Sequence, residues 1–460
     1  MDTRPHPLYI LYDARRWIPF LLIPLLRAFF TPRDAVSILL ASLRDVSFAL
    51  LLVGVSVWRW RSTRYHLSGS LTVRQGPLFV RSHTVAQDGA VSLEITRSPL
   101  MRLTNARRVR VSTAGVRRRA DVTLFLARQQ LDALLPMHSI SDFDGRVRLW
   151  PLLVMAASSS NAALGLLTLA PAVRQAGEIL GREFADSVYN FVGRFLALGL
   201  PPLLEGAANL LILSWGFSVL RSLLRYGGFH ARREGGRLHM TFGVIFRTDT
   251  LIDSRRVTAL ELRQTLFMKL FGLHTAAITA AGYGREKGVR PVIVPAAGRK
   301  ELCGLLDRLL PDFPLHSSCL RPRRTALMSY AAPPLLVCAA SLVPLWLGGV
   351  GRSIAAIGFA VGLWWLIIRL IGFAQAGFGV GREAVVIRYP RGLALYEVHV
   401  PLEVTDCLIV TQNPFQRRTG TCTLEVRCFG EKRRRHRVRA LPYLPLLALI
   451  RRFRSHRGAL

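Results

Sequence analysis

The chain has few acidic residues and few cysteines for its length. Only 28 Asp and Glu stand against 62 Lys and Arg in 460 residues. The six cysteines form no C-x-x-C pair, and their spacing fits neither a zinc ribbon nor a disulfide framework. We therefore expect free thiols that pack mostly as small hydrophobic groups in a reducing compartment.

Residue patterns that support catalysis or metal binding are also scarce. No two histidines have helical metal spacing with a carboxylate between them, and no Ser, His and acid set stands out. The glycine-rich segment 282–288 is followed by a strand-like run, Val289 to Val294, whereas a phosphate loop requires a helix at that point. This segment is therefore expected to be a hairpin turn. No catalytic residue, metal or cofactor is predicted, and the chain is not expected to be an enzyme.

Long apolar runs are abundant, and they occur in pairs. A helix needs about 20 residues to cross the hydrocarbon core of a bilayer, and most of these runs reach that length. In the first pair, Trp17–Phe30 is short, and Val46–Trp60 reaches full length only if Ala35–Leu43 contributes. The clearer pairs are Pro151–Val173 with Phe191–Leu220, and Thr325–Leu347 with Ile354–Phe373.

The excess of positive charge lies outside these runs. A soluble protein with a net charge of +34 suggests nucleic-acid binding, but the apolar runs favour a membrane protein. The loop 174–194 mixes both signs, whereas arginines follow each hairpin, and Arg321-Pro322-Arg323-Arg324 precedes the third. Because cytoplasmic loops are enriched in Lys and Arg, we expect a multi-pass membrane protein with the polar blocks and both termini in the cytoplasm.

The polar blocks repeat one another. A shift of 167 positions (243 − 76) lays the second block on the first without a gap from Gly69 to Gly115, and it matches Gly76 with Gly243 and Met101 with Met268. The third block matches the first more loosely. One matching segment is Gln412-Asn413-Pro414-Phe415, which resembles Arg97-Ser98-Pro99-Leu100. Each block is predicted to contain short strands followed by one helix. In the first block the expected strands are 71–73, 78–80, 91–96 and 108–113, and the expected helix is 124–135.

These motifs resemble those of the bacterial pleckstrin-homology (PH) domain family. In the first copy the matching motifs are 74–78, 97–100 and Thr113-Ala114-Gly115. In the second copy they are 241–245, 263–267, 271–273 and Ala280-Ala281-Gly282. The resemblance implies an α+β membrane protein of the bacterial inner membrane, with paired transmembrane helices alternating with three PH-like split β-barrels, each closed by a C-terminal helix. The second copy departs with Thr265-Leu266 where the family has Ser-Pro, and the third lacks the Thr-Ala-Gly end, which weakens the inference of a shared ligand surface.

The resemblance gives a domain plan for the whole chain. Membrane hairpins and PH-like domains alternate, in the order 1–60 N-terminal hairpin, 61–140 PH-like domain 1, 150–222 hairpin 2, 223–315 PH-like domain 2, 325–375 hairpin 3 and 376–460 PH-like domain 3.

Two kinds of residue are candidates for function. Basic runs beside the inner leaflet could bind anionic lipid at about 1 kcal/mol per cation, or they could be a solvated face that only sets topology. The candidates are Arg107, Arg108, Arg117, Arg118, Arg119, Lys432, Arg433, Arg434, Arg435 and Arg437. Glu205, inside an apolar run after Pro201-Pro202, is either a proton or cation relay or a neutral or paired side chain.

The pattern as a whole predicts a membrane-anchored array of cytoplasmic PH-like domains that acts as an interaction or scaffold protein. Its expected partners are anionic lipid headgroups, partner membrane proteins or a second copy of itself, in a setting of envelope homeostasis. Nucleic acid ranks last, because no aromatic residues interleave with the arginines. The competing hypothesis is a transporter or channel component that uses Glu205 and proline-broken spans.

Overall fold

The computed structural model divides into two compact units. Unit 1 comprises Met1–Asp142, Ile245–Asp253 and Ala281–Lys287, and unit 2 comprises Phe143–Val244, Ser254–Ala280 and Gly288–Leu460. The structure describes residues 3–15, 35–67, 70–76, 78–86, 90–113, 122–134, 145–146, 148–159, 202–280, 291–311, 313, 315, 319–347, 351–381, 383–392, 394–428 and 435–458.

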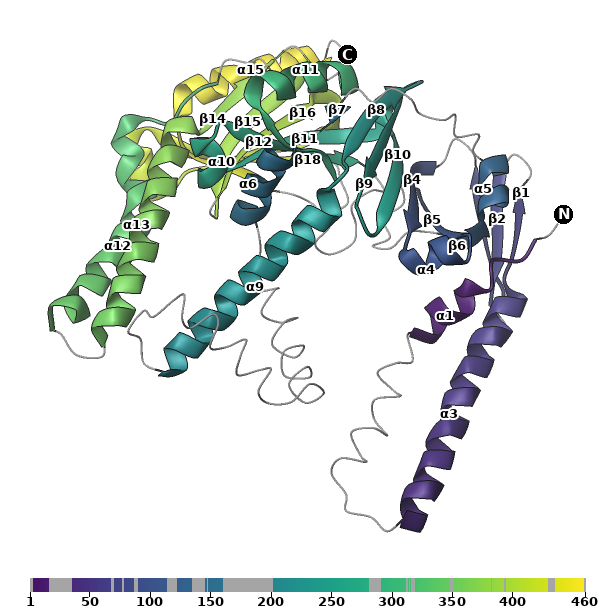
Figure 1. Cartoon of the computed structure of the whole chain (residues 1–460). Coiled ribbons are helices and arrows are strands. Elements are labelled where there is room, and N and C mark those ends of the chain that lie inside the picture. The colour runs from purple at the N-terminus through teal and green to yellow at the C-terminus, as the bar shows by residue number, and fades with distance from the viewer. Residues whose placement is uncertain are drawn as a thin grey trace. The chain divides into compact units, whose positions relative to one another are not determined.

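The described part of unit 1 contains two antiparallel sheets. In the sequence, helices precede the strands, lie between two of them and follow β6 (Figure 1). The first sheet has the order β1-β2-β3, and in the second β6, β5, β4 and β10 follow one another. The strands are β1 (Arg64–Leu67), β2 (Ser70–Gln75), β3 (Arg81–Ala86), β4 (Ala90–Arg97), β5 (Ala106–Thr113), β6 (Val122–Ala127) and β10 (Arg247–Asp253). The helices are α1 (Leu8–Ala14), α3 (Ala35–Ser62), α4 (Pro99–Leu103) and α5 (Arg128–Leu134).

Unit 2 contains a six-stranded antiparallel sheet in the order β13-β12-β11-β16-β15-β14. A three-stranded sheet, β17-β18-β19, and the strands β7, β8 and β9 complete it. The strands are β7 (Gly145–Arg146), β8 (His230–Glu234), β9 (Arg237–Phe242), β11 (Val257–Thr265), β12 (Leu273–Ala280), β13 (Val292–Gly298), β14 (Gly377–Val380), β15 (Ala384–Arg391), β16 (Ala394–Pro401), β17 (Thr405–Thr411), β18 (Thr421–Cys428) and β19 (Arg435–Pro442).

The helices of unit 2 include long apolar helices, short helices between strands, and more polar helices that follow the last strand of a group. They are α6 (Leu149–Ser159), α9 (Pro202–Tyr226), α10 (Leu266–Leu270), α11 (Arg299–Leu309), α12 (Leu327–Leu347), α13 (Gly351–Gln375), α14 (Pro414–Thr419) and α15 (Tyr443–Gly458), with one-turn 3₁₀ helices η3 (Ser254–Arg256), η4 (Arg324–Ala326) and η5 (Leu402–Val404).

The predicted repeat is present in the structure. Adding 167 to the bounds of β2, α4 and β5 gives those of β9, α10 and β12. A shift of 148 (402 − 254) likewise carries η3 onto η5 and β12 onto β18. The third copy therefore follows the second more closely than the sequence match indicated. We call the copies module 1 (β1–β6, α5), module 2 (β8–β13, α11) and module 3 (β14–β19, α15); each contains two groups of three consecutive strands and then a helix.

Two local predictions for module 1 were wrong. Residues 124–135 are not one helix, because β6 extends to Ala127 and α5 begins only at Arg128. Leu124 and Leu126 face the core, and Phe125 packs on the other face against Tyr9 and Tyr12 of α1. With both faces apolar, the strand lacks its usual alternation and imitates a helical pattern. The predicted strand 78–80 is instead part of the turn after Gly76, whose φ of +117° requires glycine.

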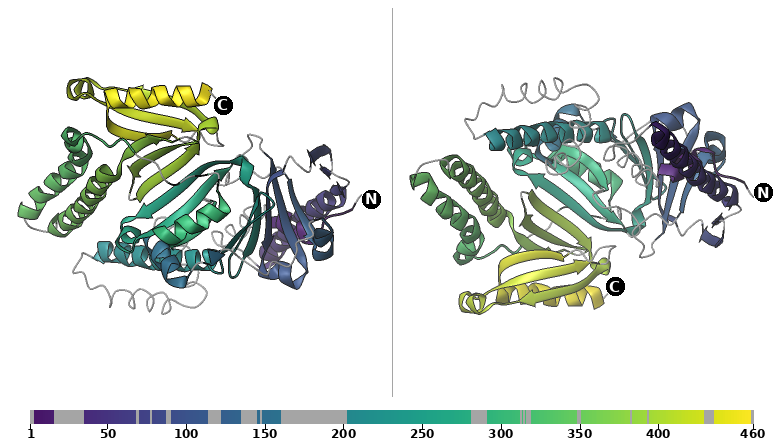
Figure 2. Two further views of the ribbon diagram at one scale, coloured as in Figure 1. Left: turned by 90° about the horizontal axis from the view of Figure 1, so that it is seen from above. Right: turned by 90° about the horizontal axis from the view of Figure 1, so that it is seen from below.

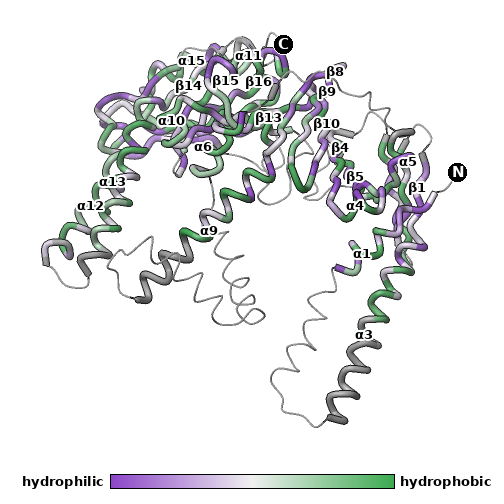
Figure 3. The backbone as a smooth tube through the Cα atoms, viewed as in Figure 1, coloured by the Kyte–Doolittle hydropathy of each residue, from purple (hydrophilic) through white to green (hydrophobic). Residues whose placement is uncertain are grey.

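In the described residues two stretches are long and apolar enough to cross a membrane, and both lie in the third predicted hairpin. They are Arg324–Pro344, which begins in η4 and continues through α12, and Ala355–Gln375 in α13 (Figure 3). In the first hairpin, α3 runs through Ala35–Ser62 without a break, so Arg44 and Asp45 lie within it. In the second hairpin, α6 and α9 are described, whereas 160–201 lies outside the described residues, as does the first run, Trp17–Phe30.

None of the six cysteines forms a disulfide in the structure. Burial raises the pKa of Cys422 to about 11 and that of Cys428 to about 12, so both remain protonated and pack as small hydrophobic groups.

Candidate anion-binding site

Modules 2 and 3 share one sheet. Strand β11 pairs antiparallel with β16, from Leu260 opposite His399 to Thr265 opposite Ala394. The two strands lie side by side in both views of Figure 2. This pairing brings side chains from segments far apart in the sequence to the two sides of one seam.

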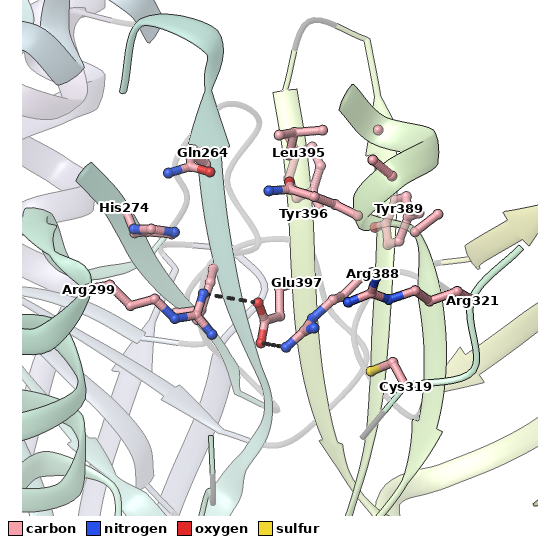
Figure 4. A pocket seen from close by; sticks show the side chains of 15 residues that line it. Gln264, His274, Arg299, Cys319, Arg321, Arg388, Tyr389, Leu395, Tyr396 and Glu397 are labelled. Atoms are coloured by element: carbon pink, nitrogen blue, oxygen red, sulfur yellow. Dashed lines mark hydrogen bonds and ion pairs between the residues drawn. The ribbon is translucent and has the colours of Figure 1, made fainter. Parts of the chain in front are cut away.

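A carboxylate lies at the centre of this seam. Glu397 on β16 accepts a hydrogen bond at 3.0 Å from the guanidinium of Arg388 on the neighbouring β15. The Nε2 atom of His399 lies 3.1 Å from the same oxygen, and Arg299 at the start of α11 approaches the other oxygen at 3.5 Å. Figure 4 shows Arg299 and Arg388 reaching Glu397 from opposite sides. The carboxylate therefore joins module 2 to module 3.

The surroundings of Glu397 keep it ionised. Burial raises its pKa, but the hydrogen bond with His399 and the charge and hydrogen bond of Arg388 lower it, and the net result is a pKa of about 2. The pKa of His274 is also lowered, by burial and by the nearby Arg299. Near pH 7 the imidazole of His274 is therefore neutral, and the positive charge of this region comes from arginine.

A cavity of about 220 Å³ opens beside the seam. Its charged lining consists of three guanidinium groups, from Arg299, Arg321 and Arg388, and the single carboxylate of Glu397. The hydroxyl-bearing rings of Tyr389 and Tyr396 stack on each other in the same wall, with ring centroids 5.7 Å apart (Figure 4). An excess of guanidinium over carboxylate is suited to binding an anion, and bidentate arginine contacts favour phosphate.

The end of the last apolar helix forms part of the cavity wall. Gly372, Ala374, Gln375 and Ala376 line it, and the candidate membrane span ends at Gln375. Helix α13 approaches strand β15 closely at Gly372, because a Cβ atom on this glycine would clash with Cβ of Pro390 on β15. The glycine thus allows α13 to pack directly against the strand that carries Arg388.

A related seam lies in unit 1. Strand β4 of module 1 pairs with β10 of module 2, from Arg97 opposite Arg247 to Ser92 opposite Ile252. Asp249 on β10 is buried and forms a 2.8 Å ion pair with Arg97. The 148-residue shift places Asp249 at the position of Glu397, so each seam has a carboxylate at the same strand position, buried at Asp249 and partly buried at Glu397.

Those of the basic residues singled out from the sequence whose side chains the structure describes do not line the cavity. Arg107 on β5 is largely buried, and Arg108 lies over the ring of Tyr12 and donates to Thr96. Arg437 is exposed on β19, and Arg435 begins that strand. Arg117, Arg118, Arg119, Lys432, Arg433 and Arg434 lie outside the described residues. Glu205 lies in the first turn of α9, in a part of the helix whose side chains are not described.

Sequence reasoning missed the residues that line the cavity. Arg299, Arg388 and Glu397 come from segments that share no motif, and Arg321 was noticed only as part of a topology-setting run. One signal in the sequence pointed to Glu397. With the third copy aligned by the 148-residue shift, Glu397 matches Asp249, and both are acidic residues within β-strands of a very basic chain. In the described part of the chain, no group of three or more His, Cys, Asp or Glu could hold a metal ion.

Comparison with known proteins agrees with the repeat. The bacterial PH domain family matches residues 18–144, 191–310 and 339–449. The UPF0699 transmembrane protein YdbT of Bacillus subtilis (strain 168) is 20% identical over 325 residues, which cover 64% of this chain and 65% of the relative. The match thus spans about two thirds of the length of that relative, and no solved structure matches significantly. The three family matches cover most of the chain, and the protein belongs to the bacterial PH domain family.

Proposed function

We propose that this chain is a membrane-anchored scaffold of PH-like modules whose seam between modules 2 and 3 binds the phosphate of an anionic lipid headgroup. The observation that carries the proposal is the arginine-rich cavity at the end of a candidate membrane span. On this proposal the modules face the cytoplasm, where anionic lipids attract cationic surfaces.

The size and place of the cavity favour a headgroup. Its volume of about 220 Å³ is below the roughly 300–1,000 Å³ of pockets for drug-sized ligands, so a phosphate and its nearest substituents fit better than a whole lipid. On this proposal α13 spans the bilayer and its apolar stretch ends at Gln375, so the cavity lies at the level of the headgroups. The acyl chains of such a lipid would remain in the bilayer beside α13.

Exposed apolar side chains support a membrane-facing surface on the modules. At matched positions of the short helices, Leu100 on α4, Phe267 on α10 and Phe415 on α14 are 60%, 53% and 81% exposed. In module 2 the ring of Phe267 lies 5.5 Å from that of Trp364 on α13, so α10 packs beside an apolar helix. Apolar groups on a short amphipathic element near basic residues are typical of contact with the membrane interface.

The headgroup site can be tested in the full-length protein reconstituted into nanodiscs. Arg299 and Arg321 are both exposed, so an Arg299→Gln/Arg321→Gln variant removes two positive charges without opening the core. At about 1 kcal/mol per cation, the affinity for fluorescent phosphatidylglycerol in a phosphatidylcholine background should fall roughly thirty-fold. Fluorescence transfer from the cavity region to the labelled lipid reports the binding.

The matched control is Arg308→Gln/Arg391→Gln, which removes the same charge from exposed positions that do not line the cavity. It should keep nearly all of the affinity. Equal losses in both variants would mean that net charge, rather than this cavity, attracts the lipid. An unchanged affinity in the cavity variant would reject the headgroup site.

A further inference from the structure

The two seams within the chain follow one rule. In each, the fourth strand of a module pairs with the third strand of the next, β4 with β10 and β11 with β16. The registers agree: Leu93 faces Leu251 in the first seam, and the equivalent Leu260 faces His399 in the second. Modules of this chain thus join head to tail through one repeated interface.

This rule leaves one strand unused at each end of the array. In the described residues β3, the third strand of module 1, pairs only with β2, and β17, the fourth strand of module 3, pairs only with β18. Strand β17 has the same irregularity as its counterparts, since a register shift after Thr405 matches those after Ala90 on β4 and Val257 on β11. The free edges are therefore the two halves of the interface that the chain already uses twice.

We propose that β17 of one copy pairs with β3 of a second copy and continues the array from chain to chain. The common register places Thr411 opposite Arg81, Val410 opposite Ser82 and Leu408 opposite Thr84. Because the interface is head to tail, it extends into a ring or a filament rather than ending at a dimer. This inference does not depend on the lipid site.

The chemistry of the two edges suits this pairing. Strand β17 carries the run Cys407-Leu408-Ile409-Val410 with neither proline nor lysine, which are the residues that usually protect a free edge from pairing. On β3, Ser82 occupies the position that Asp249 and Glu397 hold in the internal seams. Pairing between chains therefore places no carboxylate at this position, and it satisfies backbone groups that each edge otherwise leaves to water.

Disulfide trapping tests the register. Arg81 and Thr411 are both exposed, and opposite residues of an antiparallel pair are close enough for a disulfide. Two full-length variants, Arg81→Cys and Thr411→Cys, are coexpressed with different tags, each with the exposed Cys407 replaced by Ser. Mild oxidation of the membranes should yield a crosslinked species that carries both tags.

The control pairs Thr411→Cys with Arg74→Cys. Arg74 is exposed on β2, one strand farther in, so the expected Cα separation of roughly 10 Å is too long for a disulfide. Crosslinking of the Arg81 pair but not the Arg74 pair supports the proposal. Absence of crosslinking in both pairs, or equal crosslinking in both, overturns it.

A second measurement does not depend on cysteine chemistry. Ile409 is not among the β17 residues packed against the core, where Leu408 and Val410 lie, so Ile409→Lys places a charge on the free edge without emptying the core. Native mass spectrometry should show assemblies of the unsubstituted protein that fall to a single copy in this variant. A mass of one copy for the unsubstituted protein, in gentle detergent and in nanodiscs alike, contradicts the proposal.

Discussion

At the scale of single residues, Glu397 determines much of the behaviour of the seam between modules 2 and 3. It contacts Arg388 from module 3 and Arg299 from module 2, and it lies beside the fully buried His399. A buried carboxylate is stable only when hydrogen bonds and opposite charge replace its lost hydration. Removing it leaves two guanidinium groups without their shared partner.

Replacing Glu397 should therefore change stability in a pH-dependent way. Its pKa of about 2 in the folded chain lies below the ordinary value of 4.5, so the carboxylate adds stability above about pH 4.5 that is lost as pH falls toward 2. With about 1.4 kcal/mol per pKa unit, the full contribution is on the order of 3 kcal/mol. Thermal unfolding in detergent should show Glu397→Gln less stable than the unsubstituted protein at pH 7, with the difference shrinking below pH 4. A constant difference across this range would contradict this account.

At the scale of elements, each module places a short helix after its fourth strand and caps it with a polar side chain. The caps are Ser98 for α4, Thr265 for α10 and Asn413 for α14. Ser98 and Thr265 accept from the backbone N–H three residues on, at 3.2 and 3.3 Å. Module 2 has Thr265-Leu266 where the family has Ser-Pro. The helix cap is nevertheless kept, because the hydroxyl of Thr accepts the same hydrogen bond as that of Ser.

The packing of α13 on β15 depends on one glycine. Gly372→Ala should destabilise the protein, since its Cβ would lie 2.4 Å from Pro390 and force the helix away from the strand. Gly304→Ala in α11 is the control: a Cβ there meets nothing within 4 Å, and removing a helical glycine should stabilise by about 0.5–1 kcal/mol. Midpoints of thermal unfolding in detergent should therefore shift in opposite directions. A Gly372→Ala midpoint at or above that of the unsubstituted protein would refute the close packing.

At the scale of the whole molecule, the placement of charge relative to the apolar runs predicts the orientation. The 62 Lys and Arg lie mainly in the modules, which follow the apolar hairpins in sequence. An array of modules can bind headgroups of one leaflet and continue into a second copy only if all modules lie on the same side of the membrane.

Reporter fusions after Gly115, Gly282 and Gly430 test that orientation. We expect all three to give a cytoplasmic signal, because cytoplasmic loops retain Lys and Arg. A fusion in the loop 174–194, where charges of both signs mix, should report from the other side and serves as the internal control. An external signal after any of the three glycines would overturn the orientation.

Much of the module could be predicted from local pattern. The match of Gly76 with Gly243 identified turns in which both residues have positive φ, and the 167-residue register placed β9, α10 and β12. The error at 124–135 arose because a neighbouring element covers a surface: α1 covers Phe125 on the outer face of β6. A pattern that is read one segment at a time contains no information about such a covering element.

The sequence by itself determined the class of this protein: apolar runs of bilayer length, an excess of arginine beside them, and a module repeated with glycines in its turns. These features depend on residues near one another in the chain. Only the tertiary structure decided where the modules meet, which side chains line the cavity and which edges remain free. Arg299, Arg321 and Glu397 come together because β11 pairs with β16 across more than a hundred residues of chain, and hydrogen bonds between backbones leave no mark of their partner in the sequence.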